Sequence, residues 1–100
     1  MRILLVEDDA LLADGLARSL RQSGYIVEVA SDGKTADRWL ETETFDLAIL
    51  DLGLPELDGS AVLQRLRQRK QATPILILSA RMALEERVRL QVLHVVVRTQ

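Results

Sequence analysis

One stretch decides the fold: Phe-Asp-Leu-Ala-Ile-Leu-Asp-Leu-Gly-Leu-Pro at positions 45–55. Leu47 to Leu50 form an unbroken apolar run next to acidic residues, which is typical of a central strand in a parallel sheet, where both faces are covered. Asp51 then lies at the carboxyl end of this strand, at the rim where open α/β sheets bind ligands. A carboxylate beside such a run is costly to desolvate unless water, a cation or a hydrogen-bond donor meets it. Asp51 is therefore the first candidate for a functional site.

The rest of the chain alternates between strand and helix patterns. Short apolar or β-branched runs predict strands at 2–6, 25–30, 75–78 and 92–97. Helical spacing of apolar residues predicts helices between them: one that buries Leu11, Leu12, Leu16 and Leu20 and ends at Gly24, one around Ala36 to Leu40, one from Ala61, and one from Met82 to Val92. Ser31-Asp32-Gly33 is expected to form a turn or cap before the second helix. A solvated face at the end of the third helix is expected from its basic residues, Arg65, Arg67, Arg69 and Lys70. This alternation predicts one parallel sheet with helices on both faces and right-handed crossovers.

Length and composition indicate a single small globular domain over positions 1–100. The chain is 48% apolar and 28% charged, and its net charge of -2 gives no general attraction to nucleic acid, so we expect no direct nucleic-acid binding. The absence of cysteine excludes disulfides and thiolate metal sites. Because the sequence contains neither a signal peptide nor a run long enough to span a membrane, we expect a cytoplasmic protein without membrane association.

Polar residues follow three of the predicted strands. Glu7, Asp8 and Asp9 follow the first, Asp51 ends the third, and Ser79 follows the fourth. In the doubly wound strand order 2-1-3-4-5 these ends converge at the switch point between the first and third strands. Clustered carboxylates repel one another, and Mg²⁺ fits a small open acid cluster best because it keeps waters and bridges to phosphate oxygens.

This arrangement predicts phosphoryl chemistry. The cation would neutralise charge on an incoming phosphoryl group and let Asp51 attack it as a carboxylate nucleophile, while the Ser79 hydroxyl donates to a phosphoryl oxygen. Gly53 allows a close backbone approach, and its carbonyl is a possible cation ligand. Structural roles compete with these: the acids at 7–9 could cap the following helix, and Asp51 and Ser79 alone are common turn residues.

Four motifs resemble a known family. They are Leu-Leu-Val-Glu-Asp-Asp at 4–9, Leu-Asp-Leu-Gly-Leu-Pro at 50–55, Asp-Gly at 58–59 and Pro-Ile-Leu-Ile-Leu-Ser-Ala-Arg at 74–81. Together, from Met1 to about Val88, they look like the receiver domain of bacterial two-component response regulators, in the branch that carries a winged-helix DNA-binding domain. The resemblance implies a flavodoxin-like fold.

The resemblance also implies roles for individual residues. Asp51 accepts a phosphoryl group from a sensor histidine kinase, Glu7 and Asp8 form the acid pocket, and Asp8, Asp51 and the Gly53 carbonyl ligate Mg²⁺. Ser79 is then the switch hydroxyl. The protein would be a phosphoacceptor in two-component control of transcription, with no separate substrate.

The ending departs from this family. After Arg89 the family's Lys-Pro pair and fifth helix are absent, and Arg98 stands at the usual aromatic switch position. We therefore expect a receiver domain over 1–100 that is incomplete at its carboxyl end and has no effector domain. Apolar surface on the first and fifth strands should then be exposed, which predicts a homodimer or a segment-exchanged oligomer.

Two other functions stay open at this point. A degenerate receiver would act as a dimerisation or interaction module without a phosphorylation switch. A metal-dependent phosphohydrolase would share the aspartate nucleophile, but glycine at position 53 replaces the second acid that this chemistry places two residues after the nucleophile.

Overall fold

The computed structural model describes residues 1–51, 57, 59–78 and 95–98. Ser79, Gly53 and the helix expected at 82–92 lie outside these residues. The described elements follow the expected order along the chain: β1 (Arg2–Val6), α1 (Ala10–Gln22), β2 (Ile26–Ala30), α2 (Gly33–Thr42), β3 (Leu47–Asp51), α3 (Gly59–Gln68), β4 (Ile75–Leu78) and β5 (Val95–Arg98).

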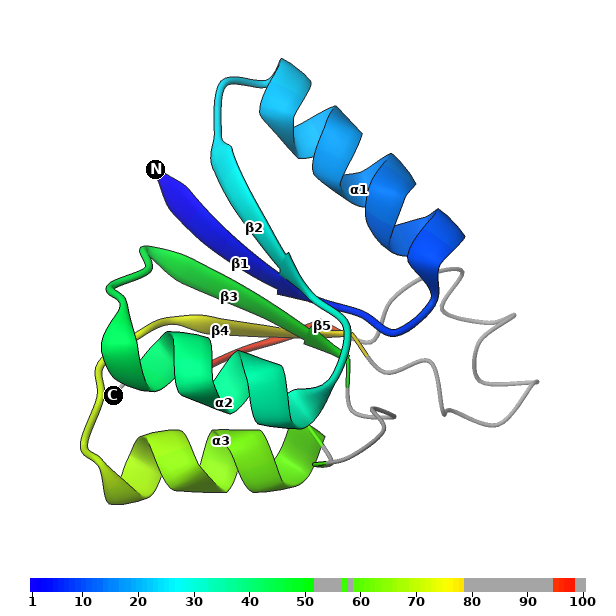
Figure 1. The fold of residues 1–100 in the computed structure, drawn as a ribbon. Helices are drawn as coiled ribbons and strands as arrows, with labels where there is room; N and C mark the ends of the chain where they lie inside the picture. Colours follow the sequence, from blue (N-terminus) through cyan, green and yellow to red (C-terminus); the bar gives the residue numbers. More distant parts are fainter. Residues whose placement is uncertain (52–56, 58, 79–94, 99–100) are drawn as a thin grey trace.

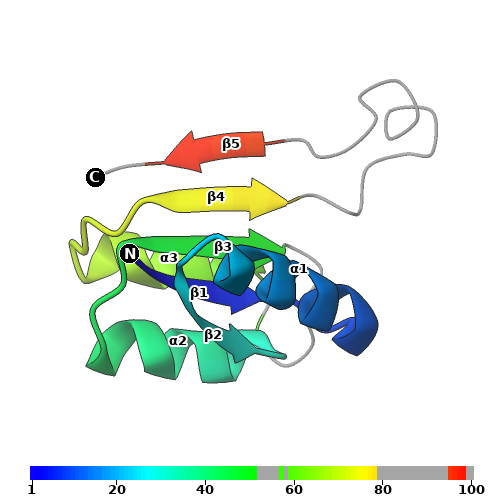
Figure 2. The ribbon, with the colours of Figure 1, turned by 90° about the horizontal axis from the view of Figure 1, so that it is seen from above.

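The five strands form one sheet with the predicted order β2-β1-β3-β4-β5. The strands β1 to β4 are parallel, as expected, but β5 runs antiparallel to β4, with Leu78 opposite Val95. Figure 2 shows the reversed arrow of β5 at the edge of the sheet. The expectation of a fully parallel sheet was therefore wrong for this strand. Residue patterns predict a strand but not its direction, and an antiparallel neighbour can start at the rim where β4 ends.

Helices cover both faces of the sheet (Figure 1). Alternate residues of β1 point to opposite faces, as strand geometry requires. Leu4 and Val6 pack with α2, α3 and the inner residues of β3 and β4, whereas Ile3 and Leu5 pack with α1. The three layers thus form because both faces of the central strands are apolar and covered by helices. Polar side chains that could act in chemistry therefore lie at the ends of these strands.

Two expectations about buried surface were wrong in part. The apolar residues of β1, from Ile3 to Val6, are all buried, so this strand does not supply the exposed apolar surface that was expected without a fifth helix.

In α1 the expected buried face is confirmed for Leu16 and Leu20, which are half-buried and pack against the core. It was wrong for Leu11 and Leu12, which are exposed. The fully buried residues of α1 are Ala13 and Ala17, whose i, i+4 phase determines which stripe meets the sheet.

A polar network joins α2 to α3. The carboxylate of Asp37 is almost fully buried and accepts from Arg65 at 3.1 Å and from Arg69 at 2.9 Å. Arg69 also donates to Gln71, whose amide in turn donates to the Leu40 carbonyl. The basic residues at the end of α3 were expected to form a solvated face, and Arg65, Arg67 and Lys70 are indeed exposed. Arg65 and Arg69, which directly follows α3, also pair with Asp37 and so join the two helices.

None of the described helices combines the length and the apolar character needed to cross a membrane.

Candidate functional site

Asp51 is the last residue of β3 and lies at the carboxyl rim of the sheet. Its backbone is held in register with Leu78 of β4, and the preceding residue, Leu50, is in register with Val6 of β1. Only 4% of Asp51 is exposed. The same register puts Glu7, which directly follows β1, beside Asp51, and the Glu7 N–H donates to the Ala30 carbonyl at 3.0 Å. Sheet pairing therefore fixes both acids.

Three acids come together at this rim. Glu7, Asp8 and Asp51 each offer a carboxylate oxygen, and these oxygens all lie within 4.8 Å of one another. Glu7 and Asp51 are buried and Asp8 is exposed. The structure thus brings together three of the four residues predicted for the acid pocket and its metal ion, while the fourth, Gly53, and the predicted switch residue Ser79 lie outside the described residues.

Asp9 has a different role from its two acidic neighbours. Its side chain accepts from the backbone N–H groups of Leu11 and Leu12, both at 3.1 Å, and caps the amino end of α1. The capping interpretation is therefore correct for this acid. The cap also starts α1 immediately beyond Asp8, which keeps the Asp8 carboxylate at the rim.

The pKa of Glu7 is raised by its position in the acid cluster. Burial raises its pKa from 4.5 to about 7, and the negative charge of Asp51 adds to this, against the opposing hydrogen bond from the Asp9 N–H. A carboxyl group whose charged form is this unfavourable is stabilised either by a proton or by a cation. Titratable groups perturbed by burial and by a like charge are concentrated at functional sites.

The donor set fits a hard divalent cation. All three side chains offer oxygen, which Mg²⁺ prefers, and one exposed acid beside two buried ones leaves room for waters or a phosphate oxygen. A hollow of about 270 Å³ opens beside the acids, lined by Glu7, Asp8, Ala10, Ala13, Asp14, Ala17, Arg21, Val29 and Ser31. Solvent can therefore reach the acids through this hollow, on the side of α1.

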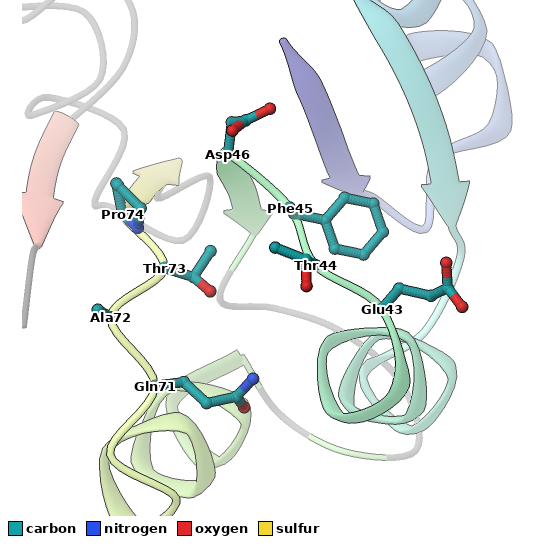
Figure 3. Close-up of a pocket in the computed structure, with 8 residues that line it drawn as sticks. All are labelled: Glu43, Thr44, Phe45, Asp46, Gln71, Ala72, Thr73 and Pro74. Atoms are coloured by element: carbon teal, nitrogen blue, oxygen red, sulfur yellow. The ribbon is translucent and has the colours of Figure 1, made fainter.

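A second hollow, of about 420 Å³, lies at the opposite end of β3 and β4. Figure 3 shows its lining: Glu43, Thr44, Phe45, Asp46, Gln71, Ala72, Thr73 and Pro74. Its two acids are both engaged by Arg2, through the guanidinium to Glu43 at 3.0 Å and through the backbone N–H to Asp46 at 2.6 Å. These contacts tie β1 to the start of β3, so the acids have a structural role here.

One residue near the acidic rim was interpreted only as part of a turn. Gly33 starts α2 and lies against Leu57, in the connection between β3 and α3. The preceding Asp32 was also expected to be a turn or cap residue, and it does cap α2 by accepting from the Thr35 N–H at 2.7 Å. The contact between Gly33 and Leu57 could not be predicted from a local sequence pattern, because the two residues are far apart in the chain.

Several known proteins are similar to this chain in sequence. The family model of the response regulator receiver domain matches residues 3–96. The response regulator protein PmrA of Pseudomonas aeruginosa is 48% identical over 88 residues, and the transcriptional regulatory protein TctD of Salmonella typhimurium is 46% identical over 89. These matches cover 88% and 89% of the chain but 40% of each relative, so the chain spans less than half the length of these relatives.

Several solved structures are also similar to this chain in fold. A Francisella response regulator receiver domain superposes with a TM-score of 0.78 at 32% identity, covering 88% of this chain and 73% of that one. The response regulator TrrA of Thermotoga maritima, in complex with Mg²⁺-BeF, gives 0.75 at 30% identity, covering 89% and 76%. The receiver domain of a Pseudomonas aeruginosa sensor histidine kinase, with a magnesium ion coordinated in its active-site cleft, gives 0.77 at 34% identity, covering 91% and 77%.

Proposed function

Because the chain belongs to the response regulator receiver domain family, we propose that it is a Mg²⁺-dependent phosphoacceptor of two-component signalling, with Asp51 as the acceptor. The observation that carries this proposal is the group of three carboxylates within 4.8 Å around the buried end of β3. A sensor histidine kinase is the proposed donor, and control of transcription, by analogy with PmrA and TctD, is the proposed output.

The proposed reaction transfers one phosphoryl group. A carboxylate oxygen of Asp51 attacks phosphorus, an O–P bond forms, and the N–P bond to the donor histidine breaks with its electron pair leaving on the imidazole. The three acids need a positive partner for this step, because an anionic phosphoryl group would otherwise approach an anionic pocket. Glu7, Asp8 and Asp51 would hold Mg²⁺, with the Gly53 carbonyl as a further proposed ligand, and the bound cation would supply that positive charge. Ser79 is the proposed switch hydroxyl that donates to a phosphoryl oxygen.

The decisive experiment is intact-protein mass spectrometry after incubation with Mg²⁺ and acetyl phosphate. Asp51→Asn removes the nucleophile, and Asp46→Asn is a matched control that makes the same change at the other end of the same strand. We expect a phosphoryl adduct on the parent and on Asp46→Asn, none on Asp51→Asn, and none in EDTA.

A folded parent that binds Mg²⁺ but gains no adduct would contradict the proposal. That result would favour the degenerate receiver, which acts through association alone. The homodimer or segment-exchanged oligomer stays a prediction, and sedimentation velocity at increasing protein concentration tests it.

A further inference from the structure

The hollow of about 270 Å³ beside the acid cluster has both acidic and apolar walls. Glu7 and Asp8 line it at the rim of the sheet, and Ala13, Ala17 and Val29 line it between α1 and β2. Its volume is just below the range of about 300 to 1,000 Å³ that drug-sized ligands occupy, so it suits a smaller group. The hollow therefore provides a small apolar space that opens directly on the acids.

The other charged residues that line this hollow have partners of their own. Asp14 accepts from Arg18 at 2.6 Å, and the guanidinium of Arg21 donates to the Val27 carbonyl at 2.7 Å. Beyond the acids, a ligand would thus meet chiefly the methyl groups of alanine and valine and the Ser31 hydroxyl. Such a wall suits a small apolar group that carries one hydrogen-bond acceptor.

Ser31 lies beside Glu7 because of the strand register. Val6 of β1 is paired with Ala30 of β2, and both side chains belong to the core cluster on the α2 and α3 side. Because successive side chains of a strand alternate between the faces, the next residues, Glu7 and Ser31, are expected to turn toward α1. Both residues do line the hollow next to α1, as this alternation requires.

The strand order places the hollow on the side of the acids that faces away from Asp51. Asp51 ends β3, Glu7 and Asp8 follow β1, and β1 lies between β3 and β2. Ser31 follows β2, on the far side of β1. In phosphoryl transfer the attacking and leaving atoms lie roughly in line, on either side of phosphorus. A group that leaves phosphorus away from Asp51, across the end of β1, therefore moves into this hollow.

We propose that the hollow holds the leaving group of a small acyl phosphate, and that Val29 and Ser31 determine which leaving groups fit. The inference rests on the proposed function, because it assigns a substrate class to the same site. A carboxylate oxygen of Asp51 forms a bond to phosphorus, the P–O bond to the acyl group breaks, and its electron pair leaves on the carboxylate product. The Ser31 hydroxyl donates to the acyl carbonyl oxygen, and the alkyl group packs against Val29.

The first test fills the hollow with a larger side chain. Val29 is 39% exposed, so Val29→Phe adds a ring at this wall without overpacking the core. Ile26→Phe is the matched control, because Ile26 is an exposed aliphatic residue of the same strand whose side chain lies on the other face. We expect labelling by acetyl phosphate to slow about tenfold in Val29→Phe, as for a group that no longer fits an apolar pocket, and to keep the parental rate in Ile26→Phe. Labelling by phosphoramidate, whose leaving group is only ammonia, should keep the parental rate in both variants.

The second test removes the hydroxyl group. Ser31→Ala should slow labelling by acetyl phosphate about three- to tenfold, the effect of one lost hydrogen bond, and leave labelling by phosphoramidate unchanged. Ser23→Ala makes the same change at the exposed end of α1 and should match the parent with both donors. If Val29→Phe does not unfold cooperatively, Ser31→Ala decides.

Equal slowing with both donors would show general damage to the acid cluster and overturn the proposal, and so would parental rates with acetyl phosphate in the folded variants. Binding is measured separately, by saturation-transfer NMR of the acetyl methyl signal in Mg²⁺. We expect transfer in the parent and in Ile26→Phe, and its loss in Val29→Phe. If neither donor labels the parent, the proposed function fails, and this NMR comparison alone decides the subsite; absence of transfer in the parent then overturns it.

Discussion

Replacing Glu7 with glutamine should remove the pH dependence that Glu7 gives to the free energy of unfolding. In the folded chain the pKa of Glu7 is raised from 4.5 to about 7, chiefly by burial, so the folded state binds this proton more tightly than the unfolded state does. The contribution of Glu7 to stability is thus complete below about pH 4.5 and is lost as the pH rises through about 7. The full difference corresponds to about 3 kcal/mol of unfolding free energy.

Glutamine keeps the shape of the side chain and an oxygen that can accept from the Asp9 N–H, as Glu7 does at 3.1 Å. Because glutamine does not titrate, the variant should resemble the parent near pH 5 and be more stable by about 2 to 3 kcal/mol near pH 8. The assay is urea unfolding in EDTA, followed by circular dichroism and by Trp39 fluorescence, across this range. Glu41→Gln is the control, since it makes the same change at an exposed site.

The reasoning fails if the stability difference between Glu7→Gln and the parent is the same at both ends of the pH range. The same experiment in Mg²⁺ separates the electrostatic cause from a packing effect. A cation in the acid cluster offsets the charge on Glu7, so the advantage of glutamine near pH 8 should shrink when Mg²⁺ is added.

Three further changes test the scaffold by chemical denaturation. Asp37→Ala should lower the unfolding free energy by about 2 to 3 kcal/mol, because it leaves two guanidinium groups without their buried partner. The control is the exposed pair of Asp14 with Arg18. There, Asp14→Ala should change the unfolding free energy by under about 0.5 kcal/mol. Asp32→Ala should lower the unfolding free energy by about 1 kcal/mol, because the cap of α2 is lost. Asp32→Asn keeps an accepting oxygen without the charge, so a parental unfolding free energy in that variant would show that the hydrogen bond, and not the charge, is responsible. Gly24→Ala should destabilise by about 1 kcal/mol, because φ at Gly24 is +96°; an unchanged midpoint would contradict this.

The central part of the fold follows from local patterns. The run at 47–50 predicts a buried strand because it has no polar face, and the acids at 7–9 mark where β1 stops. Once both strands are parallel neighbours, the meeting of Glu7 and Asp51 follows from the geometry of the sheet, and the structure bears it out. This much of the site is therefore predictable without knowledge of any contact between distant residues.

What the patterns missed depends on contacts across long stretches of sequence. The direction of β5 is set by its pairing with β4, and nothing in Val-Val-Val-Arg at 95–98 encodes it. The partners of Asp37 lie 28 and 32 residues away, on a helix whose arginines look like an ordinary solvated face. The buried stripe of α1 follows the phase of Ala13 and Ala17, whereas the size of Leu11 suggested another.

The acid cluster combines requirements that conflict in the absence of a ligand. For the proposed chemistry Asp51 has to be charged, yet it is buried beside Glu7, whose own charge is unfavourable below about pH 7. A proton on Glu7 and a divalent cation relieve the same repulsion, so they compete for the site. If the cation binds as proposed, Mg²⁺ affinity should therefore increase as the pH rises through about 7. Above that pH the proton has left Glu7, and a cation in the cluster is then the remaining partner for the negative charge of the buried rim of β3.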